Sequence, residues 1–187
     1  MDGRRQRAAH FRGTGKYTPF GRCLCAVERT VMFKIDWIVP DVLAAGQIPS
    51  SVDEIKVLRA EGIRAIVTLT ERPLSEWRTL SAELLRSFEL DTYHAPIEDF
   101  EAPSHEQAHT IINHIDAMQA AGKPIYLHCH AGIGRTGTLL HVYFMRHGQS
   151  LQEAIRSVQA RRRQCYFYML SASQQAFLQR FAESLII

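Results

Sequence analysis

The sequence has few cysteines and no apolar run long enough to cross a membrane. Its four cysteines, at positions 23, 25, 129 and 165, do not resemble a disulfide framework for a chain of 187 residues. No stretch approaches the roughly 18–20 apolar residues of a membrane span, and no signal-peptide pattern opens the sequence. We therefore expect no membrane span, and a reducing, cytoplasmic location.

Outside the first 30 residues, basic and acidic side chains are nearly balanced in number. Seven of the 22 Lys and Arg lie within residues 1–30, against only Asp2 and Glu28. The remainder is slightly acidic, so attraction to nucleic acid is not expected. We predict a basic, disordered N-terminal extension over residues 1–31 and a single domain over residues 32–187. No feature indicates an oligomer, and a monomer is expected.

Short apolar runs alternate with amphipathic stretches from residue 33 onward, which is typical of an α/β domain. Serines with Glu or Gln three residues later mark helix starts at Ser51, Ser104, Ser150 and Ser171. Glycines mark helix ends at 62, 122 and 148. The predicted strands are 36–39, 43–45, 63–69, 91–95 and 124–128. The predicted helices are 52–61, 75–88, 104–121, 134–147, 151–161 and 171–184. The fold class predicted is α/β, with a central, mostly parallel sheet flanked by helices.

The stretch HCHAGIGRTGT, at positions 128–138, fits two different motifs. GIGRTG matches the glycine fingerprint of a dinucleotide-binding turn, which needs a following strand that ends in an acidic residue. The segment after Gly148 instead has the pattern of a helix. The fingerprint also gives no reason for the cysteine and two histidines that follow the strand. The dinucleotide interpretation is therefore disfavoured.

A phosphate-binding loop accounts for every residue of the stretch. Five residues separate Cys129 from Arg135, where a helix begins, so successive backbone N–H groups can converge on one anion. Gly132 and Gly134 leave the hollow free of side chains. The loop's phosphate-binding residues are expected to be His130, Ala131, Gly132, Ile133, Gly134 and Arg135. The same donors and the helix dipole favour a thiolate at Cys129.

HCHAGIGRTGT resembles the signature H-C-x-x-G-x-x-R-T of the cysteine-dependent protein tyrosine phosphatase superfamily. The chain is most similar to its small dual-specificity phosphatases, of the atypical and CDC14-like kinds. The similarity extends over roughly residues 35–181, through WIVPDVLAAGQIP, VTLTERP, PIEDF and SQQAFL. It implies that the phosphate loop lies at the C-terminal edge of the sheet.

The resemblance implies a role for each of several side chains. Cys129 is the nucleophile, Arg135 binds the phosphoryl group, and Asp99 is the general acid, with Glu98 and Glu101 as neighbouring alternatives. Thr136 is expected to stabilise the departing sulfur, and Gln174 (or Gln175) to position the attacking water. His128 is expected to fix the loop and Glu71 to orient Arg135. Phe100 is expected either to pack under the acid loop or to line the pocket mouth.

No metal or other cofactor is expected. His105 and His109 are four residues apart, but no partner with metal-ligand spacing accompanies them. Cys165, behind the arginines 161–163, is expected to pack in the interior, although it could be a redox partner of Cys129. The arginines themselves could border the site or form a solvated helix end.

The sequence therefore predicts a phosphomonoester hydrolase that works through a phosphocysteine intermediate. Because the loop carries no lysine, we expect phosphotyrosine or phosphoserine/threonine of a protein as substrate. Inositol phosphates, phosphoinositides and RNA 5′ ends are alternatives, as is a catalytically silent phosphoprotein-binding module.

Overall fold

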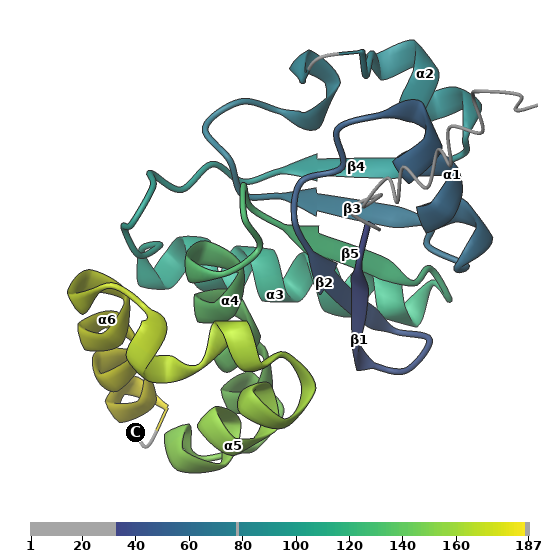
Figure 1. Cartoon of the computed structure of the whole chain (residues 1–187). Coiled ribbons are helices and arrows are strands. Elements are labelled where there is room, and N and C mark those ends of the chain that lie inside the picture. The colour runs from purple at the N-terminus through teal and green to yellow at the C-terminus, as the bar shows by residue number, and fades with distance from the viewer. Residues whose placement is uncertain (1–32, 78, 186–187) are drawn as a thin grey trace, which may run out of the picture. The chain divides into compact units, whose positions relative to one another are not determined.

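The fold is an α/β domain with a five-stranded sheet in the order β1-β2-β5-β3-β4 (Figure 1). The computed structural model describes residues 33–77 and 79–185, so the predicted N-terminal extension, 1–31, lies outside the described residues. β1 pairs antiparallel with β2, and every other pair of neighbouring strands is parallel. The strands are β1 Ile35–Val39, β2 Leu43–Gly46, β3 Ala65–Thr68, β4 Asp91–His94 and β5 Ile125–His128.

Helices cover both faces of the sheet (Figure 1). Successive side chains of a strand point to opposite faces, and apolar side chains on both faces need to be shielded from water. In β5, Ile125 and Leu127 face a core built with α3 to α6, whereas Tyr126 faces a smaller core built with α1 and α2. The helices are α1 Val52–Ala60, α2 Ala82–Ser87, α3 His105–Ala120, α4 Gly134–Arg146, α5 Leu151–Arg161 and α6 Ala172–Ser184. Short 3₁₀ turns lie at η1 Leu74–Glu76, η2 Arg163–Cys165 and η3 Phe167–Met169.

One predicted helix, 75–88, is wrong. The segment forms η1 and the short helix α2, because the Ser81 hydroxyl accepts a hydrogen bond from the Leu84 amide and starts a new helix there. Leu74, Leu80 and Leu85 are all buried on the same side of the sheet. The apolar spacing that suggested one helix therefore belongs to two short elements and the turn between them.

The other helix starts and stops lie within a residue or two of the predicted positions. Ser150 and Ser171 form full capping boxes with Glu153 and Gln174. Gly62, Gly122 and Gly148 all have positive φ where helices end. At Ser104 the box is incomplete, because the Gln107 amide nitrogen donates instead to the Pro96 carbonyl at 2.7 Å. That bond ties α3 to the loop that carries Asp99.

Candidate active site

Three parallel strands end at the same edge of the sheet and bring the candidate residues together. Gly46 of β2 and Thr68 of β3 stand on either side of His128 of β5 in the sheet register. The phosphate loop follows β5, the Thr70–Glu71 segment follows β3, and the acid loop, defined here as residues 96–103, follows β4. The carboxyl edge of parallel strands is the usual ligand site in such sheets.

The first turn of α4 differs from the first turns of the other α-helices in the described chain. Five helices begin with a serine whose hydroxyl accepts a first-turn amide hydrogen, at Ser51, Ser81, Ser104, Ser150 and Ser171. α4 instead begins after Ile133 with no side-chain cap and no acidic residue in its first turn. Its N-terminal amides and its dipole therefore remain available to an anion held in the loop.

The backbone of the phosphate loop is fixed at Gly132. Its φ of +68° is a left-handed conformation, and a Cβ there would lie 2.0 Å from the Gly46 carbonyl oxygen. The Gly132 carbonyl accepts hydrogen bonds from Arg162 Nε at 3.0 Å and from the Cys165 thiol at 3.3 Å. Gly132 thus lies buried behind the pocket, where it shapes the loop without lining the pocket wall.

Arg135 is held by three residues from two loops. Its side chain is 2% exposed; Nη1 donates to Glu71 Oε1 at 2.9 Å and to the Ile97 carbonyl at 2.8 Å. Nη2 pairs with Asp99 Oδ1 at 3.1 Å, and Nε has no partner among the described residues. Glu71 thus makes the contact expected from the sequence. Its pKa lies below the ordinary value, chiefly through a hydrogen bond with its own backbone amide, with Arg135 adding to the effect.

His128 supports the loop from inside the sheet. It is fully buried; Nδ1 lies 3.0 Å from the Cys129 carbonyl, and Nε2 lies 2.9 Å from the Thr68 hydroxyl. Burial lowers the pKa of His128 to about 4. A neutral ring that donates from Nδ1 to the carbonyl and accepts from Thr68 satisfies both contacts. This arrangement fixes the backbone on which the Cys129 side chain stands.

The two buried histidines predict a loss of stability in mild acid. Burial lowers the pKa of His128 and of His141 to about 4, whereas the unfolded chain takes up these protons near pH 6.5. Each neutral histidine therefore contributes stability fully above pH ~6.5, which is lost as the pH falls toward ~4. The contribution is up to about 3 kcal/mol per histidine.

Urea unfolding at pH 7 and pH 4.5 measures this effect. His141→Gln keeps a polar side chain that does not titrate, so the variant should lose less stability between the two pH values than the wild type. An equal loss in both proteins would contradict the assignment of His141 as a buried neutral base.

Cys129 lines a pocket of about 230 Å³ together with most of the residues expected from the sequence. Its wall consists of Asp99, Phe100, Cys129, His130, Ala131, Ile133, Gly134, Arg135, Met169, Ser171 and Gln174. Thr136 is fully buried, and its hydroxyl has no hydrogen-bond partner among the described residues. The role expected for Thr136, stabilising the sulfur as it departs, stays a prediction.

The acid loop is tied to the N-terminus of α6. The Ser171 hydroxyl donates to the Phe100 carbonyl at 2.5 Å, and the Ser173 hydroxyl donates to Glu101 Oε2 at 2.7 Å. The Gln174 amide nitrogen donates to the Glu101 carbonyl at 3.1 Å, while its oxygen completes the capping box with Ser171. These bonds keep Asp99 beside Arg135.

Gln174 and Gln175 are separated by their positions. Gln174 is 1% exposed and lines the pocket, while the Gln175 amide donates to the Leu170 carbonyl at 2.8 Å. Gln174 is therefore the one of the two that is placed to contact a water beside Cys129. Phe100 lines the pocket mouth with 72% of its surface exposed, so it is not packed under the acid loop.

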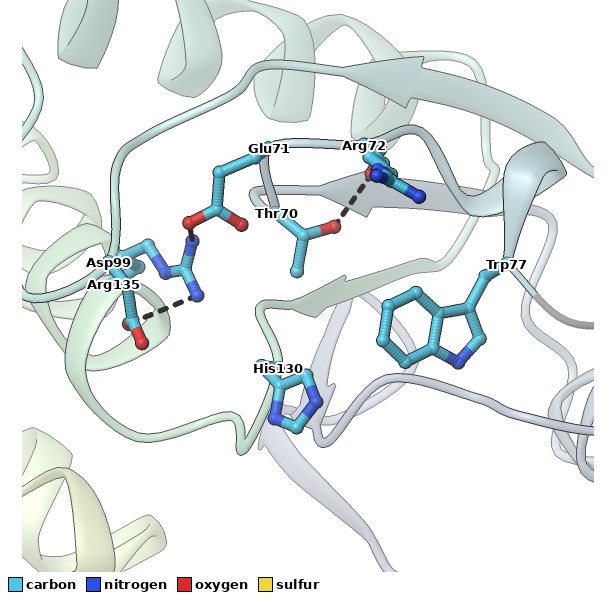
Figure 2. A pocket seen from close by; sticks show the side chains of 7 residues that line it. All are labelled: Thr70, Glu71, Arg72, Trp77, Asp99, His130 and Arg135. Carbon is cyan, nitrogen blue, oxygen red and sulfur yellow. Dashed lines mark hydrogen bonds and ion pairs between the residues drawn. The ribbon is translucent and has the colours of Figure 1, made fainter.

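A second hollow, of about 350 Å³, adjoins the first on the side of Asp99 and Arg135 (Figure 2). In this view Glu71 and Arg72 lie at the top, Asp99 and Arg135 on the left and the Trp77 indole on the right. The Trp77 ring is edge-on to the ring of His130, with 5.6 Å between the ring centroids. We call this hollow the side groove. The Arg72 carbonyl accepts a hydrogen bond from Thr70, and no ion pair involves the Arg72 guanidinium among the described residues.

Sequence reasoning missed the role of Arg162. Its side chain is buried, where it donates to Gly132 and pairs with Asp36 Oδ2 of β1. One signal was present, since Asp36 is an acidic residue inside an otherwise apolar strand, which requires a buried partner. The middle arginine of the triplet thus supports the loop from behind, while Arg161 and Arg163 are exposed.

Cys165 packs in the interior, as expected. Burial raises the pKa of its thiol to about 12, which disfavours the reactive thiolate form. His105 and His109 contact the rings of Phe177 and Phe181. Within residues 33–77 and 79–185, no group of three His, Cys, Asp or Glu could hold a metal ion. Nor does the described chain contain a helix of the length and apolarity needed to cross a membrane.

Comparison with known families agrees with this geometry. A model for the family "Polymorphic toxin system, DSP-PTPase phosphatase" matches residues 43–149, more than half of the chain. The chain belongs to this family of dual-specificity-type phosphatases. This family lies within the cysteine-dependent protein tyrosine phosphatase superfamily, so the resemblance inferred from the sequence is confirmed.

Two curated relatives come from Arabidopsis thaliana. The phosphatidylglycerophosphate phosphatase PTPMT1 is 31% identical over 126 residues, which cover 64% of this chain and 35% of the relative. The phosphatidylglycerophosphate phosphatase PTPMT2 is 27% identical over 150 residues, which cover 77% of this chain and 61% of the relative. The chain thus spans about a third and about three fifths of the relatives it matches.

Solved structures share the fold. Tk-PTP in its active form is 29% identical, with a TM-score of 0.69 over 80% of this chain and 96% of that one. Kinase-associated phosphatase is 19% identical, with a TM-score of 0.70 over 82% of this chain and 96% of that one. A PTPMT1 structure in complex with PI(5)P is 21% identical, with a TM-score of 0.67 over 80% of this chain and 94% of that one.

Proposed function

We propose that this protein removes the terminal phosphate of a glycerophosphate-type phospholipid headgroup through a phosphocysteine intermediate. The observation that carries this proposal is that the two Arabidopsis relatives described above are named phosphatidylglycerophosphate phosphatases. The phosphoprotein substrate expected from the sequence depended on the lack of lysine in the loop. The lack of a lysine does not argue against a lipid headgroup, because Arg72 of the side groove supplies a cation beside the loop.

In the first step of this mechanism, the Cys129 sulfur attacks phosphorus and the bond to the leaving oxygen breaks. Asp99 gives its proton to that oxygen, and the loop amides and Arg135 bind the phosphoryl oxygens. Nη2 of Arg135 pairs with Asp99 at 3.1 Å, and Nε has no hydrogen-bond partner among the described residues. Nε, and Nη2 once it leaves Asp99, can bind the phosphoryl group, while Nη1 stays on Glu71 and Ile97.

In the second step, water attacks the phosphocysteine and the phosphorus–sulfur bond breaks. Asp99 accepts the proton of the water, which Gln174 orients. The sulfur leaves as a thiolate and receives a hydrogen bond from the Thr136 hydroxyl. The unpaired state of that hydroxyl supports this role, because a buried donor without a partner can serve a charge that forms only during the reaction.

The side groove favours a substrate whose headgroup bears a second phosphate. Asp99 lines both hollows, so the leaving group that it protonates can extend from the pocket into the groove. In phosphatidylglycerophosphate, the glycerol and then a phosphodiester follow the leaving oxygen. The glycerol would lie near Trp77 and His130, and the phosphodiester near Arg72 (Figure 2).

Turnover of matched soluble substrates tests the proposal. We expect kcat/KM for a short-chain, monomeric phosphatidylglycerophosphate to exceed that for a phosphotyrosine or phosphothreonine peptide by at least about tenfold, the effect of one added charged contact. Cys129→Ser serves as the blank for contaminating activity. A preference for either peptide would overturn the proposal. Binding without hydrolysis of any substrate would instead indicate a phosphate-binding module.

A role within a polymorphic toxin system is a second candidate, favoured by the description of the matched family. Here hydrolysis of a host phosphomonoester would inhibit growth. Wild-type protein expressed in a bacterial host should then slow growth, whereas Cys129→Ser at equal abundance should not. Equal growth of the two cultures would count against this role.

A further inference from the structure

Two exposed, large apolar side chains line the catalytic pocket, and a third is next to one of them in the sequence. Phe100, Tyr168 and Met169 are 72%, 69% and 70% exposed. Phe100 and Met169 both line the pocket, and Tyr168 precedes Met169 in η3. The Ser171 hydroxyl joins the two segments through the Phe100 carbonyl. We call these three residues the apolar rim. Clustered apolar side chains of this kind mark interaction sites, unlike scattered ones.

The backbone conformation at the exposed Phe100 is strained. Its φ of +62° lies in the left-handed region, which is strained for an aromatic residue. The Asp99 carboxylate accepts the Phe100 amide at 3.1 Å, and Ser171 donates to its carbonyl, so both backbone groups are fixed. A strained turn that exposes an aromatic ring beside a catalytic pocket points to a function of the exposed ring.

We propose that the apolar rim inserts into the surface of a lipid bilayer, so that a headgroup phosphate enters the catalytic pocket from the membrane. This inference deepens the proposed function and rests on it. Insertion places the pocket mouth at the level of the headgroups. Phe, Tyr and Met side chains are suited to this depth, where a ring can lie among the acyl chains and a hydroxyl can stay hydrated.

The shape of the rim favours a bilayer over a phosphopeptide. Peptides are bound along a sheet edge or in a groove. The rim side chains project, with about 70% of each surface in solvent, and the hollow that they border is the catalytic pocket itself. A fluid interface accepts projecting side chains, whereas a peptide would need walls on either side.

Flotation of the full chain with phosphatidylcholine vesicles at high salt tests the inference. Neutral lipid and high salt suppress binding by the basic N-terminal segment. We expect Tyr168→Ser to weaken the partition onto vesicles by about tenfold relative to wild type. Val57→Ser is the matched control, because Val57 is an exposed apolar residue on α1 that lines none of the described hollows. This variant should partition like wild type.

Tyr168 also contacts the rings of Tyr166 and Phe167, so its replacement could disturb η3. Met169→Gln, a change of similar length, provides a second variant and should also weaken the partition. Equal partition of wild type and both rim variants would overturn the inference, as would an equal loss in Val57→Ser. A raised KM for phosphopeptides with unchanged vesicle binding would make the rim a peptide-contacting surface and would also overturn it.

These vesicles contain no phosphomonoester, so the flotation result does not depend on which substrate is hydrolysed. Hydrolysis of the short-chain lipid without rim-dependent vesicle binding would refute only the bilayer contact. Rim-dependent binding without hydrolysis of that lipid would refute only the proposed substrate.

Discussion

Cys129→Ser is expected to lower kcat for p-nitrophenyl phosphate by more than about 10⁴-fold while leaving affinity for inorganic phosphate within a few-fold of wild type. A serine hydroxyl is far less acidic than a thiol, so it supplies almost no anionic nucleophile. The groups that bind the oxyanion are unaffected, because the α4 amides carry no competing cap and Arg135 is fixed by Glu71 and the Ile97 carbonyl.

The matched control for this prediction is Cys165→Ser. Cys165 is the other cysteine in the described part of the chain; it is fully buried, and burial raises its pKa to about 12. Turnover by this variant should stay close to that of wild type, since serine can still donate to the Gly132 carbonyl. Steady-state assays give kcat, and calorimetric titration with phosphate gives the affinity. Substantial turnover by Cys129→Ser would show that another group attacks phosphorus.

Asp99→Asn should lower kcat/KM by about 10²–10⁴-fold for an alkyl phosphate such as glycerol 3-phosphate. The reason is that an alkoxide leaves poorly without a proton. For p-nitrophenyl phosphate the loss should be much smaller, because nitrophenolate leaves as an anion. Asparagine keeps the size of the side chain and can still face Arg135, so the comparison isolates the missing proton.

Glu98→Gln and Glu101→Gln are the controls in the same loop. Glu101 accepts a hydrogen bond from Ser173 of α6, and neither glutamate lines the catalytic pocket. Both variants should treat the two leaving groups as the wild type does. If Asp99→Asn slowed both esters equally, or if a glutamate variant showed the selective loss instead, the proton donor would be a different residue.

The sequence predicted most of the local structure because short-range chemistry determines it. Serine caps and C-terminal glycines lie within a few residues of the helix ends they define, so Ser150, Ser171 and Gly148 were recognisable from spacing alone. The phosphate loop was equally accessible, because Cys129 and Arg135 lie on one short segment. Only the region before Ser81 was misjudged, where an apolar spacing was shared by two elements.

Long-range contacts were much harder to predict. Arg162 and Asp36 are 126 residues apart. The position of Asp36 in an apolar strand indicates that it has a buried partner, but no local pattern indicates that the partner is Arg162. Ser171, which ties the acid loop to α6, was assigned as a helix cap only, and Ser173 was given no role, since the tertiary partner of a hydroxyl depends on the fold. Glu71 was a guess from the sequence because its neighbour Arg135 is 64 residues away.

The Arg162 contact also links anion binding to completion of folding. One guanidinium joins the first strand, the end of α5 and the carbonyl of Gly132, so the loop acquires its shape only after distant segments have assembled. Contacts of such separation in sequence form late and slowly. A partly folded chain would therefore have no affinity for phosphate, and a bound oxyanion would stabilise only the finished domain, by an amount that grows with its concentration.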